Sequence, residues 1–321
     1  MKRSTGLRLA IITIGLSVFA SFSQAEDVRA FVDDAGRSVE IPLSPKRIVS
    51  LHDVSFTIPL LELGIHPVGS HGRTTTEGEP FIRSSKGLTG IDFDNSSIEF
   101  MGNLPADIER VAAVSPDLII TSAWQTASVE QLEQIAPTVV LDGSQREDYE
   151  IYDLLAEVVG AEDQLATLKR RYQGQIEEVR RLIDTETITV NVIQGVNGDV
   201  LSWHTYGNLG KVLRDAGFQF PERVNAIPEG DFVRFSAESF PELDADFLFV
   251  TYRTDTEETP ADAVAHLEQV APNFCDFLYA CRNNQMAIMP REEASSTSYY
   301  ALGIMAYTVI SHISGREFQP Q

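Results

Sequence analysis

The sequence predicts an α/β protein of two similar lobes, each built on a parallel-rich sheet, with one long α-helix bridging them and a ligand cleft between them. Three observations favour this architecture: an internal repeat, alternating strand and helix patterns, and one uninterrupted helical stretch. Residues 131–137 (QLEQIAP) return as 266–272 (HLEQVAP), with five of seven positions identical. Only two copies occur, about 130 residues apart, so a solenoid is excluded and two lobes remain. A cleft between two lobes is where a ligand is usually held.

The similarity of the two halves extends upstream of the repeat. An apolar strand pattern introduced by an aspartate begins at Asp117 and again at Asp246. A glutamate stands eight residues before each aspartate, Glu109 in the first half and Glu238 in the second. The two glutamates therefore occupy equivalent places in the two predicted lobes.

Residues 1–25 are predicted to be a signal peptide and not part of the fold. A basic start precedes an apolar run over 9–20, and SQA at 23–25 provides the small–x–small pattern that predicts cleavage after Ala25. The run is shorter than the roughly 20 residues of a membrane span, and no cysteine follows it to take a lipid. A soluble exported protein is therefore favoured over the alternative, an uncleaved membrane anchor.

The N-terminal lobe, residues 26–160, reads as strands alternating with helices. Its helical patterns end at breakers such as Gly64, Pro116 and Pro137. This alternation predicts a parallel sheet built from right-handed crossovers. The expected strands cover 47–51, 66–70, 118–121 and 138–141, and the expected helices 58–63, 108–114 and 132–136.

The connecting segment, residues 161–184, carries one long helical signal over 162–183. Its apolar positions recur three or four residues apart, and the rest of its surface is charged. A helix of this length spans roughly 33 Å, enough to run along both lobes. No flexible linker rich in Gly, Ser or Pro interrupts it, so a large hinge opening is not expected.

The C-terminal lobe, residues 185–321, repeats the alternation of strands and helices. Gly217 is expected to stop one of its helices. The expected strands cover 187–193, 247–251 and 286–289, and the expected helices 208–215 and 299–313.

The charge of the chain excludes one class of partner. It carries 25 Lys+Arg against 47 Asp+Glu, a formal net charge of −22. Removal of residues 1–25, which hold three basic and no acidic residues, takes this to −25. Such a surface repels nucleic acid and anionic lipid. An arginine on a loop that faces a cleft is conspicuous in so acidic a protein.

Both cysteines lie in one short stretch, Cys275 and Cys281. In an oxidising compartment this spacing predicts a local disulfide. The alternative, a metal site, would need more ligands nearby, and no histidine lies within eight residues of either cysteine. Elsewhere, no His-x-x-x-His pair or His-rich loop indicates a metal site.

Three motifs in order resemble the periplasmic substrate-binding proteins of ABC importers for iron–siderophores, haem and cobalamin. The opening at 31–42 (FVDDAGRSVEIP) with 45–50 (PKRIVS) is similar to the start of that family. Residues 107–120 (DIERVAAVSPDLII) resemble its most recognisable internal segment, and 206–218 (YGNLGKVLRDAGF) a helix of its second lobe. The resemblance covers essentially the whole mature chain.

The resemblance implies two Rossmann-like lobes joined by a single long helix. It implies a monomeric periplasmic binding protein, not an enzyme and without a permanently bound cofactor. Its ligand would be an Fe(III)-siderophore, delivered to the inner-membrane ABC permease dimer. The family uses one glutamate per lobe to dock onto arginines of that permease, and Glu109 and Glu238 match those positions.

Ligand contacts are expected just after the strands, because ligands of open α/β sheets sit outside the carboxyl ends of the strands. Arginine suits the carbonyl, carboxylate or catecholate oxygens of an anionic ferric siderophore. Tryptophan and tyrosine add rigid contact area with a polar tip. The predicted ligand contacts are His52, Arg73, Trp124, Trp203, Arg234, Tyr252, Arg253 and Arg291.

Four other polar residues are considered as ligand contacts and are ranked lower. His71 and His204 are weaker candidates for polar contacts, whereas Arg83 and Arg110 are assigned to the solvated surface.

Three alternatives remain open on sequence grounds. The ligand could instead be haem, cobalamin or a bare metal ion. A secreted enzyme on an α/β scaffold is a second reading, although the chain has no G-x-S-x-G elbow, P-loop or H-E-x-x-H motif. An exported sensor or scaffold that has lost its ligand is the third. Fold alone does not decide between them.

Overall fold

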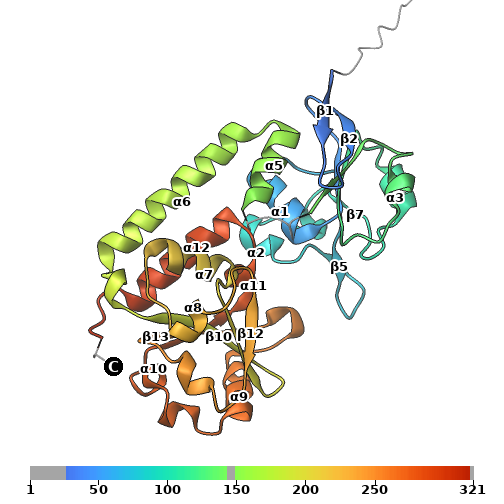
Figure 1. The fold of residues 1–321 in the computed structure, drawn as a ribbon. Coiled ribbons are helices and arrows are strands. Elements are labelled where there is room, and N and C mark those ends of the chain that lie inside the picture. The colour runs from blue at the N-terminus through green and yellow to red at the C-terminus, as the bar shows by residue number, and fades with distance from the viewer. Residues whose placement is uncertain (1–26, 143–148, 319–321) are drawn as a thin grey trace, which may run out of the picture.

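The computed structural model describes residues 27–142 and 149–318. The predicted signal peptide lies outside the described residues. Within them, no helix combines the length and apolar character needed to cross a membrane. Figure 1 shows two lobes, with α6 running along one side of the molecule between them.

The N-lobe is built on a parallel sheet of strand order β7-β4-β3-β8-β9. Its inner strand β8 is buried at all five positions, as expected for a strand covered on both faces. Two hairpins, β1–β2 and β5–β6, lie outside this sheet. The strands are β1 Val28–Val32, β2 Ser38–Pro42, β3 Ile48–Ser50, β4 Gly69–Ser70, β5 Arg73–Thr74, β6 Pro80–Phe81, β7 Glu99–Phe100, β8 Leu118–Ser122 and β9 Thr138–Leu141. The helices are α1 Ile58–Glu62, α2 Ser85–Thr89, α3 Ile108–Ala113, α4 Val129–Leu132 and α5 Glu150–Val159.

The helix α6 (Glu162–Leu182) joins the lobes. Acidic residues open it and Arg180 and Arg181 lie in its last turn, so both ends suit the helix dipole. One stripe is buried, including Leu165, Tyr172 and Val179, and it packs against α5, α7 and α12.

The C-lobe sheet has the order β12-β11-β10-β13-β14. Strands β10, β13 and β14 run parallel, whereas β11 and β12 are antiparallel to their neighbours. The strands are β10 Val190–Val196, β11 Asp199–Trp203, β12 Phe232–Phe235, β13 Phe247–Tyr252 and β14 Met286–Pro290. The helices are α7 Gly207–Ala216, α8 Glu222–Asn225, α9 Pro260–Val270, α10 Tyr279–Arg282, α11 Arg291–Ser295 and α12 Tyr299–Ile313.

The two aspartates of the internal repeat have the same structural task. Asp117 accepts hydrogen bonds from the backbone N–H groups of Lys46 (2.6 Å) and Arg47 (2.9 Å), just before β3. Asp246 accepts one from the N–H of Thr189 (2.8 Å), just before β10. Each aspartate therefore ties the start of its own strand to the start of the neighbouring one.

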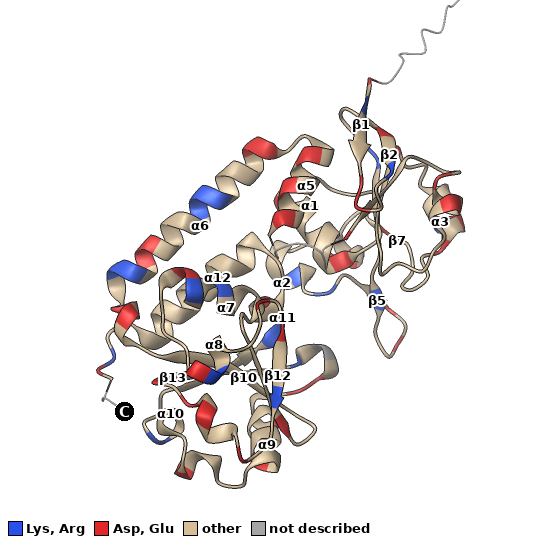
Figure 2. Ribbon diagram, in the orientation of Figure 1, with Lys and Arg blue, Asp and Glu red and all other residues tan. Residues whose placement is uncertain are grey.

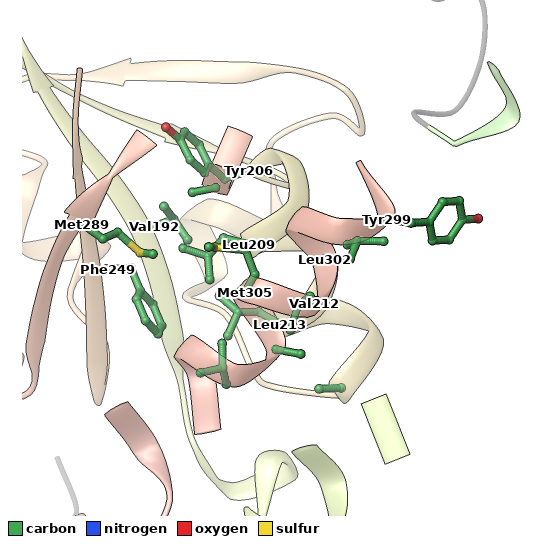
Figure 3. Close-up of a cluster of buried hydrophobic side chains, with 14 of the residues drawn as sticks. Val192, Tyr206, Leu209, Val212, Leu213, Phe249, Met289, Tyr299, Leu302 and Met305 are labelled. Carbon is green, nitrogen blue, oxygen red and sulfur yellow. The ribbon is translucent and has the colours of Figure 1, made fainter. Parts of the chain in front are cut away.

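The core of the C-lobe lies between its sheet and the helices α7 and α12. Figure 3 shows Phe249 of the sheet facing Leu209 and Leu213 of α7 and Met305 of α12. Each such buried side chain contributes about 1.5–3 kcal/mol relative to exposure. The cluster continues through the buried stripe of α6 into the N-lobe.

The structure confirms the predicted fold class, with two sheets of parallel-rich order bridged by a long helix. Cys275 and Cys281 are joined by a disulfide, with their Cα atoms 5.0 Å apart. This loop belongs to an insertion between the second repeat copy and β14, whereas in the N-lobe β9 follows the first copy directly.

Candidate functional site

A cleft of about 690 Å³ lies between the lobes. Its N-lobe wall comes from residues that follow β3, β4, β7 and β8, and its C-lobe wall from residues that follow β13 and β14. The cleft therefore lies at the carboxyl ends of the parallel strands of both sheets, where open α/β sheets hold their ligands. Its volume falls within the range of small-molecule sites.

His52 begins the N-lobe wall and caps the short helical turn η1 (Asp53–Thr57). Its Nδ1 accepts a hydrogen bond from the backbone N–H of Ser55 at 3.0 Å. Burial lowers the pKa of His52 to about 4, and the nearby Arg83 guanidinium acts in the same direction against the opposing charge of Asp53. His52 is therefore neutral at pH 7, with its proton on Nε2. Its ring stacks on that of His71, with centroids 5.9 Å apart.

Asp53 and Arg83 form a buried ion pair behind this wall. The Asp53 carboxylate is fully buried. It accepts hydrogen bonds from Arg83 Nε at 2.8 Å and from Arg83 Nη2 at 2.5 Å. His71 Nδ1 lies 3.4 Å from the same carboxylate. Burial alone would raise the pKa of Asp53, but the hydrogen bonds from Arg83, with His71 acting in the same direction, outweigh it and hold the pKa well below its usual range. The charge of Arg83 is thus balanced inside the protein.

Arg83 was expected on the solvated surface, and the structure instead places it in the wall of the cleft. The physical reason is Asp53, because the guanidinium of Arg83 compensates the charge of that buried carboxylate. Arg83 comes to it from 30 positions along the chain, through the turn between β6 and α2.

Other N-lobe residues that line the cleft include an arginine, a tryptophan and an asparagine. Arg73 on β5 is exposed and faces the cleft. Trp124, in the turn after β8, is 69% exposed, an unusual fraction for the largest apolar side chain. Asn103 lines the wall next to His71, with Oδ1 3.1 Å from His71 Nε2.

Most of the C-lobe wall is formed by the short helix α11. Its first three residues, Arg291, Glu292 and Glu293, follow β14 directly and line the cleft. Asn208 of α7 holds the backbone of α11 in place, because its Nδ2 donates a hydrogen bond to the carbonyl of Glu293 at 2.8 Å. Figure 2 shows the basic and acidic residues of α11 side by side.

Four of the predicted ligand contacts do not line the cleft. Trp203 is half-buried and packs edge-on against Tyr206, with centroids 4.6 Å apart. Arg234 is exposed on β12, 3.9 Å from Asp199, beside a separate shallow hollow. Tyr252 is half-buried against the C-lobe core. Arg253 follows it, and only the next residue, Thr254, reaches the cleft wall.

The structure thus brings together His52, Arg73, Trp124 and Arg291 in one cleft. It adds residues that the sequence analysis did not single out as contacts: Arg83, Asn103, Glu292 and Glu293. Glu292 and Glu293 follow Arg291 directly, so their place at a strand end was a usable signal. Arg83 and Asn103 had no comparable signal, because the neighbouring strands are only two residues long.

Comparison with known proteins decides the family. The sequence pattern of the family described as "Periplasmic binding protein" matches residues 82–289. The chain belongs to the periplasmic binding protein family. This membership confirms the family predicted from the three motifs, and it implies a place of action outside the cytoplasm.

Similar members of the family include two curated proteins. One is the iron(3+)-hydroxamate-binding protein YxeB of Bacillus subtilis, 26% identical over 72% of this chain and 69% of its own length. Another is the ferric enterobactin-binding periplasmic protein FepB of Escherichia coli, 25% identical over 84% of this chain and 90% of its own. A similar crystal structure is that of Staphylococcus aureus SirA complexed with staphyloferrin B. Its TM-score is 0.68 at 22% identity, covering 88% of this chain and 98% of SirA.

Proposed function

We propose that this periplasmic binding protein captures a ferric siderophore of anionic character in the cleft and delivers it to an inner-membrane ABC permease. The observation that carries the proposal is the cleft itself: about 690 Å³ between the lobes, lined by arginines and an exposed tryptophan. The relatives that bind iron(3+)-hydroxamates and ferric enterobactin support the class of ligand.

Two arginines are proposed to make the anion contacts. Arg83 is already balanced by Asp53. Arg73 on the N-lobe and Arg291 on the C-lobe have no ion pair within the described part of the chain, and they face the cleft from opposite walls. Glu292 and Glu293 also line the C-lobe wall. Recognition therefore depends on where the ligand places its oxygens, because the cleft is not uniformly positive.

The remaining wall suits the organic frame of a chelate. Trp124 and Leu104 offer exposed apolar area on the N-lobe side. An aromatic face next to an arginine is a common arrangement for a ligand with both apolar and oxygen-rich surface.

Titration of the purified protein with ferric citrate-type, catecholate and hydroxamate chelates, alongside haem and cobalamin, tests the proposal. Trp124 fluorescence should be quenched by an anionic ferric siderophore with a Kd of about 1 μM or tighter, near −8 kcal/mol. Arg73→Ala and Arg291→Ala should each weaken binding by about 2–5 kcal/mol. Arg181→Ala, exposed on α6, serves as the control.

Tight binding of haem or cobalamin without a response to any siderophore would contradict the proposal. Protein purified from the periplasm of iron-starved cells gives a second view of the same question. Its native mass should show both the chain cut after Ala25 and the bound chelate.

A further inference from the structure

A buried carboxylate, Glu62, lies where the two lobes meet. It is the last residue of α1 in the N-lobe and is only 1% exposed. Figure 1 shows α12 of the C-lobe reaching towards α1 and α2 of the N-lobe at this place. Ile58 of α1, Leu88 of α2 and Ala301 of α12 form a small apolar cluster there.

Four groups donate hydrogen bonds to Glu62, and three of them come from the other lobe. The backbone N–H groups of Tyr299 and Tyr300 lie 2.8 Å from Oε2 and 3.3 Å from Oε1, respectively. The Ser298 hydroxyl donates to Oε1. The fourth donor is the Tyr152 hydroxyl of α5, 2.7 Å from Oε2. The three C-lobe residues cap and open the helix α12.

These partners favour an ionised carboxylate. Backbone N–H groups only donate, and Ser298 Oγ already accepts from the Ala301 N–H at 3.0 Å, which leaves its own hydrogen for Glu62. A protonated carboxyl would bring a fifth hydrogen to a place with four donors. The negative charge also lies at the N-terminus of a fifteen-residue helix, where the helix dipole favours it. Burial raises the pKa of Glu62, and the same four hydrogen bonds oppose that shift.

The connection through Glu62 runs from one cleft wall to the other. On the N-lobe side, α1 continues the turn η1, which starts beside His52. On the C-lobe side, α12 follows α11, which carries Arg291. Asn208 donates to the Glu293 carbonyl of α11 and, at 2.9 Å, to Ser296 Oγ, while the Tyr149 hydroxyl donates to Asn208 Oδ1. The same Tyr149 hydroxyl accepts a hydrogen bond from the backbone N–H of Ser298 at 3.2 Å, so the C-lobe wall is tied to a residue that binds Glu62.

We infer that Glu62 is a positioning residue that fixes the orientation of the lobes and thereby sets the width of the cleft. Its removal leaves buried donors on α12 without an acceptor, which weakens the attachment of α12 to α1. The lobes then remain joined through α6, the Tyr149–Asn208 hydrogen bond and the apolar cluster of Ile58, Leu88 and Ala301, which hold their orientation less firmly. This inference concerns the free protein and does not depend on the identity of the ligand.

Pulsed electron–electron double resonance, which measures the distance between two spin labels, tests this role of Glu62 on the full mature protein. Spin labels are placed through Gln134→Cys and Gln269→Cys, which are exposed, equivalent positions of the internal repeat, one in each lobe. The described part of the chain holds no free cysteine to compete for the label. In this background, Glu62→Gln leaves one acceptor oxygen in place of two, and Tyr152→Phe removes one donor and keeps the ring. Glu177→Gln, exposed on α6, is the matched control.

Glu62→Gln should broaden and shift the distribution of inter-lobe distances, Tyr152→Phe should do so to a smaller extent, and Glu177→Gln should reproduce the parent protein. Circular dichroism establishes that each variant is folded, so a change of distance is separated from unfolding. If Glu62→Gln does not fold, Tyr152→Phe decides the question. Distance distributions that match the control in the folded variants would overturn the inference.

Discussion

The pair formed by Asp53 and Arg83 shows how one residue can be both part of a binding wall and a condition of stability. The carboxylate is completely buried, and two nitrogens of one guanidinium satisfy it in a bidentate geometry. Removing one partner of a buried pair is much more damaging than removing both, because a lone buried charge has no compensation. Arg83 is therefore not a neutral surface position.

Arg83→Ala is expected to lower the free energy of unfolding by about 3–5 kcal/mol, because it leaves the Asp53 carboxylate buried and unpaired. The double variant Asp53→Asn/Arg83→Ala should lose less than Arg83→Ala alone, since the amide carries no charge. Urea denaturation of the ligand-free protein at pH 7 measures both values. Arg181→Ala, whose ion pair with Glu178 is exposed, should change stability by less than about 1 kcal/mol. A double variant that loses as much free energy of unfolding as Arg83→Ala alone, or more, would contradict this account.

At the scale of elements, the C-lobe wall is placed by the close approach of α7 and α11. Gly207, the first residue of α7, has a φ of +43°, and a Cβ there would lie 2.6 Å from Ser295 Cα and 2.9 Å from the Ala294 carbonyl. Both atoms belong to the backbone of α11, so a side chain at this position has no flexible neighbour to displace. The glycine allows α11, and with it Arg291, to lie against α7.

Gly207→Ala should push α11 away from α7 and weaken ligand binding about tenfold or more, which corresponds to about 1.4 kcal/mol. The proposed ferric siderophore is the ligand for this measurement. Gly174→Ala on α6 is the matched control, because a Cβ at Gly174 meets nothing within 4 Å. That substitution should stabilise the protein by about 0.5–1 kcal/mol and leave affinity unchanged. Equal affinities of the two variants would show that α11 is not placed in this way.

The sequence predicted those elements whose pattern is local and strongly periodic. The closing helix was expected over 299–313 and is observed as Tyr299–Ile313, and the connecting helix differs from its expected range by one residue at the end. The hairpin β1–β2, the helices α5 and α9, and the strands β11 and β12 were not predicted. In α5 the apolar residues Ile151, Leu155 and Val158 do carry a helical spacing. In β12 three of four residues are exposed, so no alternation was visible.

The site residues likewise divide into those with a local signal in the sequence and those without one. His52, Trp124 and Arg291 follow predicted strands, and the rule that ligands lie at strand ends places them in the cleft. Arg83 follows no predicted strand, and its position depends on a buried partner 30 residues away. Trp203 ends β11, a strand that runs antiparallel to β10, so its end lies away from the carboxyl edge of the parallel strands. The rule does not apply to such a strand.

At the scale of the whole molecule, the two lobes share equivalent aspartates and glutamates of the internal repeat. Asp117 and Asp246 bind corresponding backbone groups, and each fixes the strand that follows Glu109 or Glu238. Both glutamates are exposed. Their local structures differ, because Glu109 lies in the first turn of α3, whereas Glu238 lies in a turn before a short 3-10 helix. The two glutamates therefore have equivalent positions in the sequence repeat, but only Glu109 lies in a helix.

The proposed role of Glu109 and Glu238 is to dock the protein onto cations of a two-fold permease, one glutamate for each half. Two like charges, one on each lobe, would fix the orientation in which the protein binds the permease more than the strength of that binding. Because neither residue lines the cleft, Glu109→Ala and Glu238→Ala should leave ligand affinity unchanged and reduce ferric siderophore uptake by cells. The double variant should be more impaired than either single variant.

Glu40→Ala on β2 and Glu186→Ala in the C-lobe remove the same charge from exposed positions and control for the change of net charge. Uptake is compared at equal protein level, with affinity measured on the same variants in solution. A loss of uptake shared by the control pair would assign the effect to overall charge. Normal uptake by the double variant would exclude the docking role. Impaired uptake confined to Glu109 and Glu238, with affinity intact, would separate delivery to the permease from capture of the ligand, because neither glutamate lines the cleft.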